Sequence, residues 1–80
     1  MKILVVGMGC PKCKSTEQNV RKACEELKLN CEVEHVYDPK QFAQLGVRIT
    51  PAVVANGEVL FSGKVPTVEE LKTALKQIAG

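Results

Sequence analysis

The sequence predicts an α/β fold in which a four-stranded mixed sheet is flanked by helices, in the element order β-α-β-α-β-β-α. A β-rich apolar run, an amphipathic helix and a second strand open the chain, which implies parallel pairing with a right-handed crossover. The later pair Asn56-Gly57 is the strongest short signal for an antiparallel hairpin. A capped amphipathic helix follows this hairpin. We expect the 80 residues to form a single domain, 1–80.

The first strand is expected at Ile3–Val6, an apolar run typical of a strand buried on both faces of a sheet. This run is shorter than the ~7–15 residues of a signal-peptide core. No stretch approaches the ~20 apolar residues that a membrane span needs. We therefore expect a cytoplasmic protein with no membrane association. Gly7-Met8-Gly9 ends the strand.

A helix is expected to begin after Cys10, its N-cap, with Pro11 at the first helical position, and to extend to about Lys28. Helical spacing puts four residues on one stripe: Cys13, Val20, Cys24 and Leu27. Cys13 should therefore face the core, whereas Cys10 lies one turn earlier, at the open end of the helix.

The second strand is indicated by alternating apolar and polar residues that begin at Cys31 and continue toward Tyr37. Asp38-Pro39 then supplies a cap and a proline for a short helix. This helix should end near Leu45, with Gly46 just beyond it.

The second half of the chain contains a hairpin and a helix. Two strands, Ala52–Ala55 and Glu58–Ser62, flank the Asn-Gly turn. Thr67 and Glu70 form a capping box that begins the final helix. The residues expected to face inward from this helix are Val68, Leu71, Ala74, Leu75 and Ile78.

Composition excludes a nucleic-acid-binding role. The net charge of +2 has interspersed signs, too weak for a basic footprint. Three aromatic residues are too few for a base-stacking platform. We expect no nucleic-acid partner and a monomeric protein. The four cysteines all lie in the first half of the chain, a distribution unlike that of a structural disulfide framework.

Cys10 and Cys13 have the Cys-x-x-Cys spacing, which lets two sulfurs approach bonding distance at a helix start. Disulfide exchange needs one exposed thiolate as nucleophile and a second thiol that resolves the mixed disulfide. A helix N-terminus supplies free N–H groups and a positive dipole end, and in such motifs the cysteine pKa falls from ~8.5 to ~3.5–7.5. We therefore predict Cys10 as the nucleophile and Cys13 as the resolving thiol.

Cys10-Pro11-Lys12-Cys13 after a strand, with Thr50-Pro51 before a hairpin, resembles the thioredoxin/glutaredoxin superfamily. The similarity is greatest to its minimal branch of small redox-active disulfide proteins. The resemblance covers nearly the whole chain and implies a minimal thioredoxin fold. It implies catalytic roles for the two cysteines and a cis peptide bond at Pro51. That bond would bring Thr50 beside the sulfurs, where its backbone can pair with a substrate chain.

The resemblance also implies which partners to expect. No tryptophan precedes Cys10, and Leu4 stands where thioredoxins usually place an aspartate. The Gly-Gly-Asp segment that helps glutaredoxins hold glutathione is absent, so we do not expect efficient glutathione binding. Protein disulfides are the expected substrates, reduced with electrons from a thioredoxin-reductase-like or other dithiol reductant. No cofactor or metal is expected besides the Cys10–Cys13 disulfide.

A metal-binding module is the alternative interpretation. Gly7 through Cys13 also resembles the Gly-Met-x-Cys-x-x-Cys loop of heavy-metal-associated domains, whose soft thiolates select Cu(I). Those domains have the order β-α-β-β-α-β and end in a strand. The Thr50-Pro51 pair, the Asn-Gly hairpin and the capped helix on which this chain closes favour redox chemistry over a Cu(I) chaperone.

Other candidate residues receive smaller roles. Cys24 and Cys31 are interpreted as packing residues, because free cysteine is among the most buried residue types. The alternative is a second disulfide between them, which would be unusual in a reducing compartment. His35, the single histidine, is given no catalytic role. Met8, Gly9 and Pro11 flank Cys10 and are expected to contact substrate together with Thr50 and Pro51.

Overall fold

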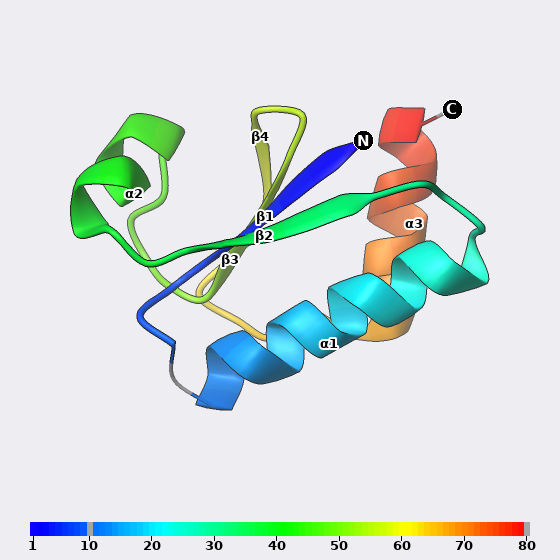
Figure 1. Cartoon of the computed structure of the whole chain (residues 1–80), viewed down its shortest axis with the longest axis horizontal. Coiled ribbons are helices and arrows are strands. Elements are labelled where there is room, and N and C mark those ends of the chain that lie inside the picture. The colour runs from blue at the N-terminus through cyan, green and yellow to red at the C-terminus, as the bar shows by residue number, and fades with distance from the viewer. Residues whose placement is uncertain (10, 80) are drawn as a thin grey trace.

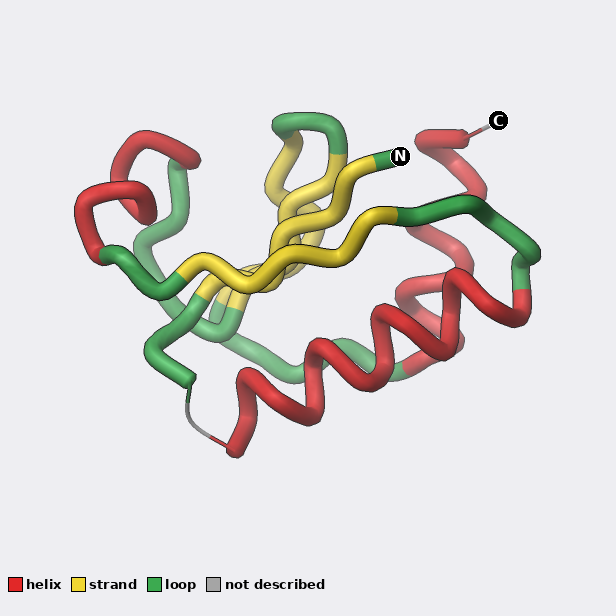
Figure 2. The backbone as a smooth tube through the Cα atoms, viewed as in Figure 1, coloured by secondary structure: helices red, strands yellow, loops and turns green. Residues whose placement is uncertain are grey.

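Strands and helices follow one another in the predicted order in the computed structural model, which describes residues 1–9 and 11–79 (Figures 1 and 2). The elements are β1 (Lys2–Val6), α1 (Pro11–Glu26), β2 (Glu32–Val36), α2 (Pro39–Leu45), β3 (Ala52–Ala55), β4 (Glu58–Ser62) and α3 (Val68–Ala79). The predicted α/β class and element order are confirmed.

The four strands form one mixed sheet in the order β2-β1-β3-β4. β1 and β2 are parallel, with Ile3 opposite Val33, whereas β3 is antiparallel to both β1 and β4. Asn56 and Gly57 have φ of 52° and 82°, the positive values that a tight hairpin turn requires. The predicted parallel crossover and antiparallel hairpin are therefore both present.

Helices cover the two faces of the sheet unequally. α1 and α3 lie on one face, and α2 lies on the other (Figure 1). The main core lies between the sheet and the helices α1 and α3. Its buried residues are Ile3, Val5, Val20, Ala23, Cys24, Val53, Ala55, Leu71 and Leu75. A smaller cluster under α2 contains Val6, Val36, Val47, Ala52 and Val54.

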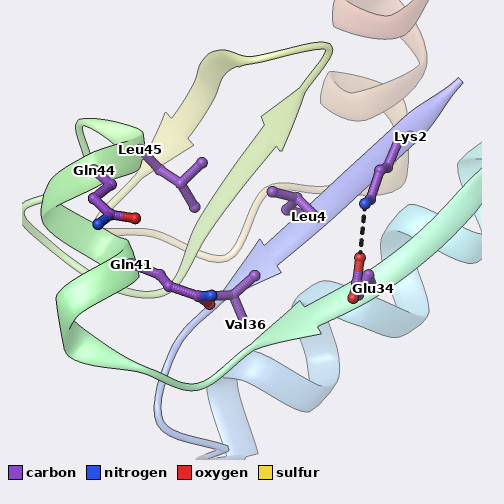
Figure 3. A pocket seen from close by; sticks show the side chains of 7 residues that line it. All are labelled: Lys2, Leu4, Glu34, Val36, Gln41, Gln44 and Leu45. Carbon is purple, nitrogen blue, oxygen red and sulfur yellow. Dashed lines mark ion pairs between the residues drawn. The ribbon is translucent and has the colours of Figure 1, made fainter.

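β1 is not buried along its whole length, which corrects the prediction of a strand buried on both faces. Leu4 is only half-buried, because α2 has seven residues and leaves part of this face uncovered. A cavity of about 240 Å³ lies there. Figure 3 shows side chains that line it, among them Leu4 and Val36 of the strands and Gln41 and Gln44 of α2. An ion pair of 3.2 Å between Lys2 and Glu34 closes its other side.

Local end signals fix most helix boundaries. The Asp38 side chain accepts a hydrogen bond from the Lys40 N–H at the start of α2, and Gly46 ends that helix with φ of 80°. At α3, the Thr67 hydroxyl accepts from the Glu70 N–H at 3.1 Å, and the Glu70 carboxylate accepts from the Thr67 N–H at 3.0 Å. The predicted capping box is confirmed.

The end of α1 and the start of β2 differ slightly from prediction. The helix ends at Glu26 rather than near Lys28, because Lys28 has the left-handed φ of 56° and turns the chain. β2 begins at Glu32, one residue after Cys31. Among the residues described by the structure, no helix is long and apolar enough to cross a membrane.

Candidate active site

The predicted site residues come from three chain segments at one end of the sheet. These segments are the loop after β1, the first turn of α1 and the loop before β3. Cys10 lies outside the described residues, so its N-cap position, exposure and nucleophilic role stay predictions. The neighbouring residues nevertheless show how the segments meet.

Cys13 is the buried centre of this site. It lies in the first turn of α1 with no exposed surface, facing the core as its place on the helical stripe predicts. A methyl group added at Gly7 would lie 2.1 Å from its Sγ and 3.8 Å from Cβ of Thr50. The loop after β1, the helix start and the loop before β3 are therefore in contact at Cys13.

Gly7 has a role that its sequence position did not reveal. The sequence marks it only as the end of a strand, but the Cys13 sulfur occupies the space that any side chain at this position would need. The Gly7 N–H donates a hydrogen bond of 3.0 Å to the Val36 carbonyl. This bond fixes the loop to the end of β2, so that the loop backbone forms one wall against the sulfur.

Thr50 and Pro51 lie in the loop before β3, close to Gly7. Their peptide bond is cis, as the resemblance implied. Pro51 is buried and Thr50 is half-buried. The loop is tied to the end of the hairpin, because the Gly63 N–H donates to the Pro51 carbonyl at 3.0 Å and the Ser62 hydroxyl donates to the Ile49 carbonyl at 2.7 Å.

An exposed apolar rim surrounds the site. Met8, Tyr37 and Ile49 are 63%, 57% and 62% exposed, and they are the large hydrophobic residues with exposed side chains in the described part of the chain. Met8 belongs to the loop after β1, and Ile49 directly precedes Thr50. Pro11, predicted as a substrate contact, is also exposed at the start of α1.

Tyr37 is a member of the rim that sequence reasoning missed. Its Cε1 would lie 3.1 Å from a methyl group added at Gly9, the residue before Cys10. Gly9 has φ of 83° and brings its backbone close to the aromatic ring. The available signal was the position of Tyr37 just after the second strand, because parallel strands end at the same edge of a sheet.

The ring of His35 packs against the ring of Tyr37. The two rings stack with centroids 4.1 Å apart and an interplanar angle of 11°. His35 Nδ1 lies 3.7 Å from a carboxylate oxygen of Glu17 on α1. Glu17 is far from His35 in the sequence and reaches it only through the packing of α1 on β2. This contact orients the ring on which Tyr37 rests.

Charge near the site is positive. Lys12 and Lys14 are exposed in the first turn of α1, which contains no acidic residue.

Within residues 1–9 and 11–79, no three side chains of His, Cys, Asp or Glu are grouped to hold a metal ion. The helix α2 separates β2 from the β3–β4 hairpin, whereas the second and third strands of heavy-metal-associated domains follow each other directly.

Comparisons with known proteins agree with this geometry. A family model described as a thioredoxin domain matches residues 1–76. A thioredoxin of Methanocaldococcus jannaschii is 45% identical over 74 residues, which cover 92% of this chain and 85% of the relative. A thioredoxin of Methanothermobacter thermautotrophicus is 35% identical over 75 residues, covering 94% of this chain and 97% of the relative. The chain belongs to the thioredoxin family and is a thioredoxin-like thiol–disulfide oxidoreductase.

Proposed function

We propose that Cys10 and Cys13 carry the exchange and that protein disulfides are the substrates. The Cys10 thiolate attacks one substrate sulfur, forms a mixed disulfide and releases the first substrate thiol. The Cys13 thiolate then attacks Cys10 and releases the second thiol, leaving a Cys10–Cys13 disulfide. Two electrons pass to the substrate, and a thioredoxin-reductase-like or other dithiol reductant restores both cysteines. No further cofactor takes part.

The burial of Cys13 against the backbone of Gly7 carries this proposal. A resolving thiol must wait beside the nucleophile without reacting with external disulfides, and Cys13 has no exposed surface. Its position against Gly7 and close to Thr50 places it where three segments of the fold converge. The second sulfur of the pair is that of Cys10, which precedes Cys13 by three residues in the sequence.

The apolar rim supports a polypeptide substrate. Met8, Tyr37 and Ile49 offer exposed hydrophobic surface on loops around the site, and such surface on a small protein marks an interaction site. A small thiol tripeptide would leave most of this surface uncovered. We therefore propose that a protein segment docks across the rim, and that the protein works as a monomer in the cytoplasm.

Serine variants test the two roles by turnover of a protein disulfide, such as that of insulin, with dithiothreitol as electron donor. Cys10→Ser should abolish turnover, whereas Cys13→Ser should accumulate mixed disulfides with the substrate. Cys31→Ser is the matched control for loss of a thiol elsewhere and should keep turnover within about twofold. Full multiple turnover by Cys13→Ser would refute the resolving role.

A further inference from the structure

Two thiols that the proposed function does not use lie together at the far end of α1. Cys24 is in the last turn of the helix and is 5% exposed, and Cys31 directly precedes β2 and is partly exposed. Both are free cysteines in the same core cluster, as expected for packing residues. Cys31 also raises the pKa of the Cys24 thiol, so the two side chains lie close enough to interact.

The backbone holds this pair in place from both sides. The Leu29 N–H donates to the Cys24 carbonyl at 3.0 Å, and the Lys28 N–H donates to the Glu25 carbonyl at 3.1 Å. These are the two bonds of a Schellman turn, with Lys28 in its left-handed position. The turn folds the chain back over the last turn of the helix, so Cys31 returns to the side chain of Cys24.

β2 fixes the other side of the pair. The Glu32 N–H donates to the Met1 carbonyl at 2.8 Å, and Lys2 is opposite Glu32 in the parallel β1–β2 register. Cys31 is therefore anchored by its direct neighbour at the edge of the sheet. A disulfide forms without backbone movement only where the two Cα atoms are close and the Cβ vectors do not point apart.

We propose that Cys24 and Cys31 form a second reversible dithiol–disulfide couple, oxidised by low-molecular-weight disulfides. The Cys31 thiolate attacks the external disulfide, forms a mixed disulfide and releases one small thiol. The Cys24 thiolate then attacks the Cys31 sulfur and releases the second small thiol. One S–S bond breaks, one forms, two protein thiols are oxidised and two small thiols are produced.

The environments of the two sulfurs set this order. Burial raises the pKa of Cys24 to about 12, and its interaction with Cys31 acts in the same direction. Cys24 therefore stays protonated while both thiols are reduced, and the partly exposed Cys31 meets the oxidant first. Once Cys31 is in a mixed disulfide it carries no charge, so one cause of the raised Cys24 pKa disappears as ring closure begins.

This couple is independent of Cys13. Cys13 and Cys24 lie in the first and last turns of α1, separated along the helix axis by about 16 Å at ~1.5 Å per residue. Their sulfurs cannot exchange within one molecule. The second couple therefore goes beyond the proposed function and responds to the small-disulfide pool by itself.

Peptide connectivity tests the proposal on the 80-residue chain. The protein is equilibrated with reduced and oxidised glutathione over a range of ratios, quenched with acid, alkylated under denaturing conditions and digested with trypsin. Cleavage after Lys28 separates the two cysteines, so their disulfide joins peptide 23–28 to peptide 29–40. As the share of oxidised glutathione rises, the joined peptide should replace both alkylated peptides. Both alkylated peptides should disappear with the same midpoint ratio, and excess dithiothreitol should reverse the change.

Matched serine variants separate the two steps. The Cys24→Ser variant should stop at a glutathione adduct on Cys31. The Cys31→Ser variant should form no adduct on Cys24, provided that circular dichroism shows this variant to be folded. A wild-type chain that stops at the Cys31 adduct, or keeps both thiols alkylatable at every ratio, would overturn the proposal. Neither readout involves disulfide reductase activity, so this outcome is distinct from failure of the Cys10–Cys13 mechanism.

Discussion

Replacement of Gly7 by alanine is the most direct test of the packing around Cys13. The added methyl carbon would lie 2.1 Å from Cys13 Sγ, whereas ordinary contact needs about 3.5 Å or more. The sulfur must therefore move by more than about 1 Å or the start of α1 must shift. Overpacking of this kind costs about 1–3 kcal/mol of stability. A displacement of about 1 Å at a reacting group can lower a rate by about 100-fold.

Two measurements check this prediction. Urea unfolding gives the loss of stability of Gly7→Ala, and rapid acid quenching gives the lifetime of the mixed disulfide with a protein substrate. We expect Gly7→Ala to unfold at lower urea and to resolve the mixed disulfide about 100-fold more slowly. Formation of the mixed disulfide should change much less, because the clash is with Cys13.

A double-mutant cycle isolates the clash. The methyl group would lie 3.4 Å from Cβ of Cys13, an ordinary contact. In a Cys13→Ala background the sulfur is gone, so adding Gly7→Ala should cost little further stability. An equal loss of stability in both backgrounds would show that the backbone at Gly7, rather than its distance from the sulfur, causes the effect, and would refute the reasoning.

Three further predictions concern the rim and the start of α3. Tyr37→Ala should raise KM for a protein disulfide several-fold and Tyr37→Phe should not, because the ring supplies the exposed surface; equal KM values for all three proteins would exclude a substrate contact. Thr67→Ala should lower the free energy of unfolding by about 1 kcal/mol in urea titrations, because the capping hydroxyl is lost; an unchanged midpoint would contradict this role. The hydrogen bond from Lys64 lowers the pKa of Glu70 below its ordinary value of 4.5, with help from the Thr67 N–H. The contribution of the Glu70 carboxylate to stability is therefore present above pH ~4.5 and is lost as the pH falls through its lower pKa in the folded state. Glu70→Gln should be less stable than the wild type at pH 7 and should approach it near pH 2, and a constant difference would contradict the assignment.

Local sequence signals predicted most element boundaries correctly. The hairpin strands, the start and end of α2 and the capping box of α3 all agree with the structure. Each depends on contacts between residues a few positions apart, such as the paired positive φ values of Asn56-Gly57. Among the boundaries that shifted, the end of α1 and the start of β2 flank Lys28, a residue whose left-handed conformation has no sequence signal.

The sequence by itself determined the fold class, the element order and the inward orientation of Cys13, because these follow from hydrophobic periodicity, caps and turn residues. Tertiary structure alone placed Gly7 against the Cys13 sulfur, Tyr37 over Gly9, and Cys31 beside Cys24. These contacts join different elements, and their distances depend on how α1 packs on the sheet and how each loop returns to it. Residue type and spacing set neither quantity, so the details of the site emerge only when the chain is folded.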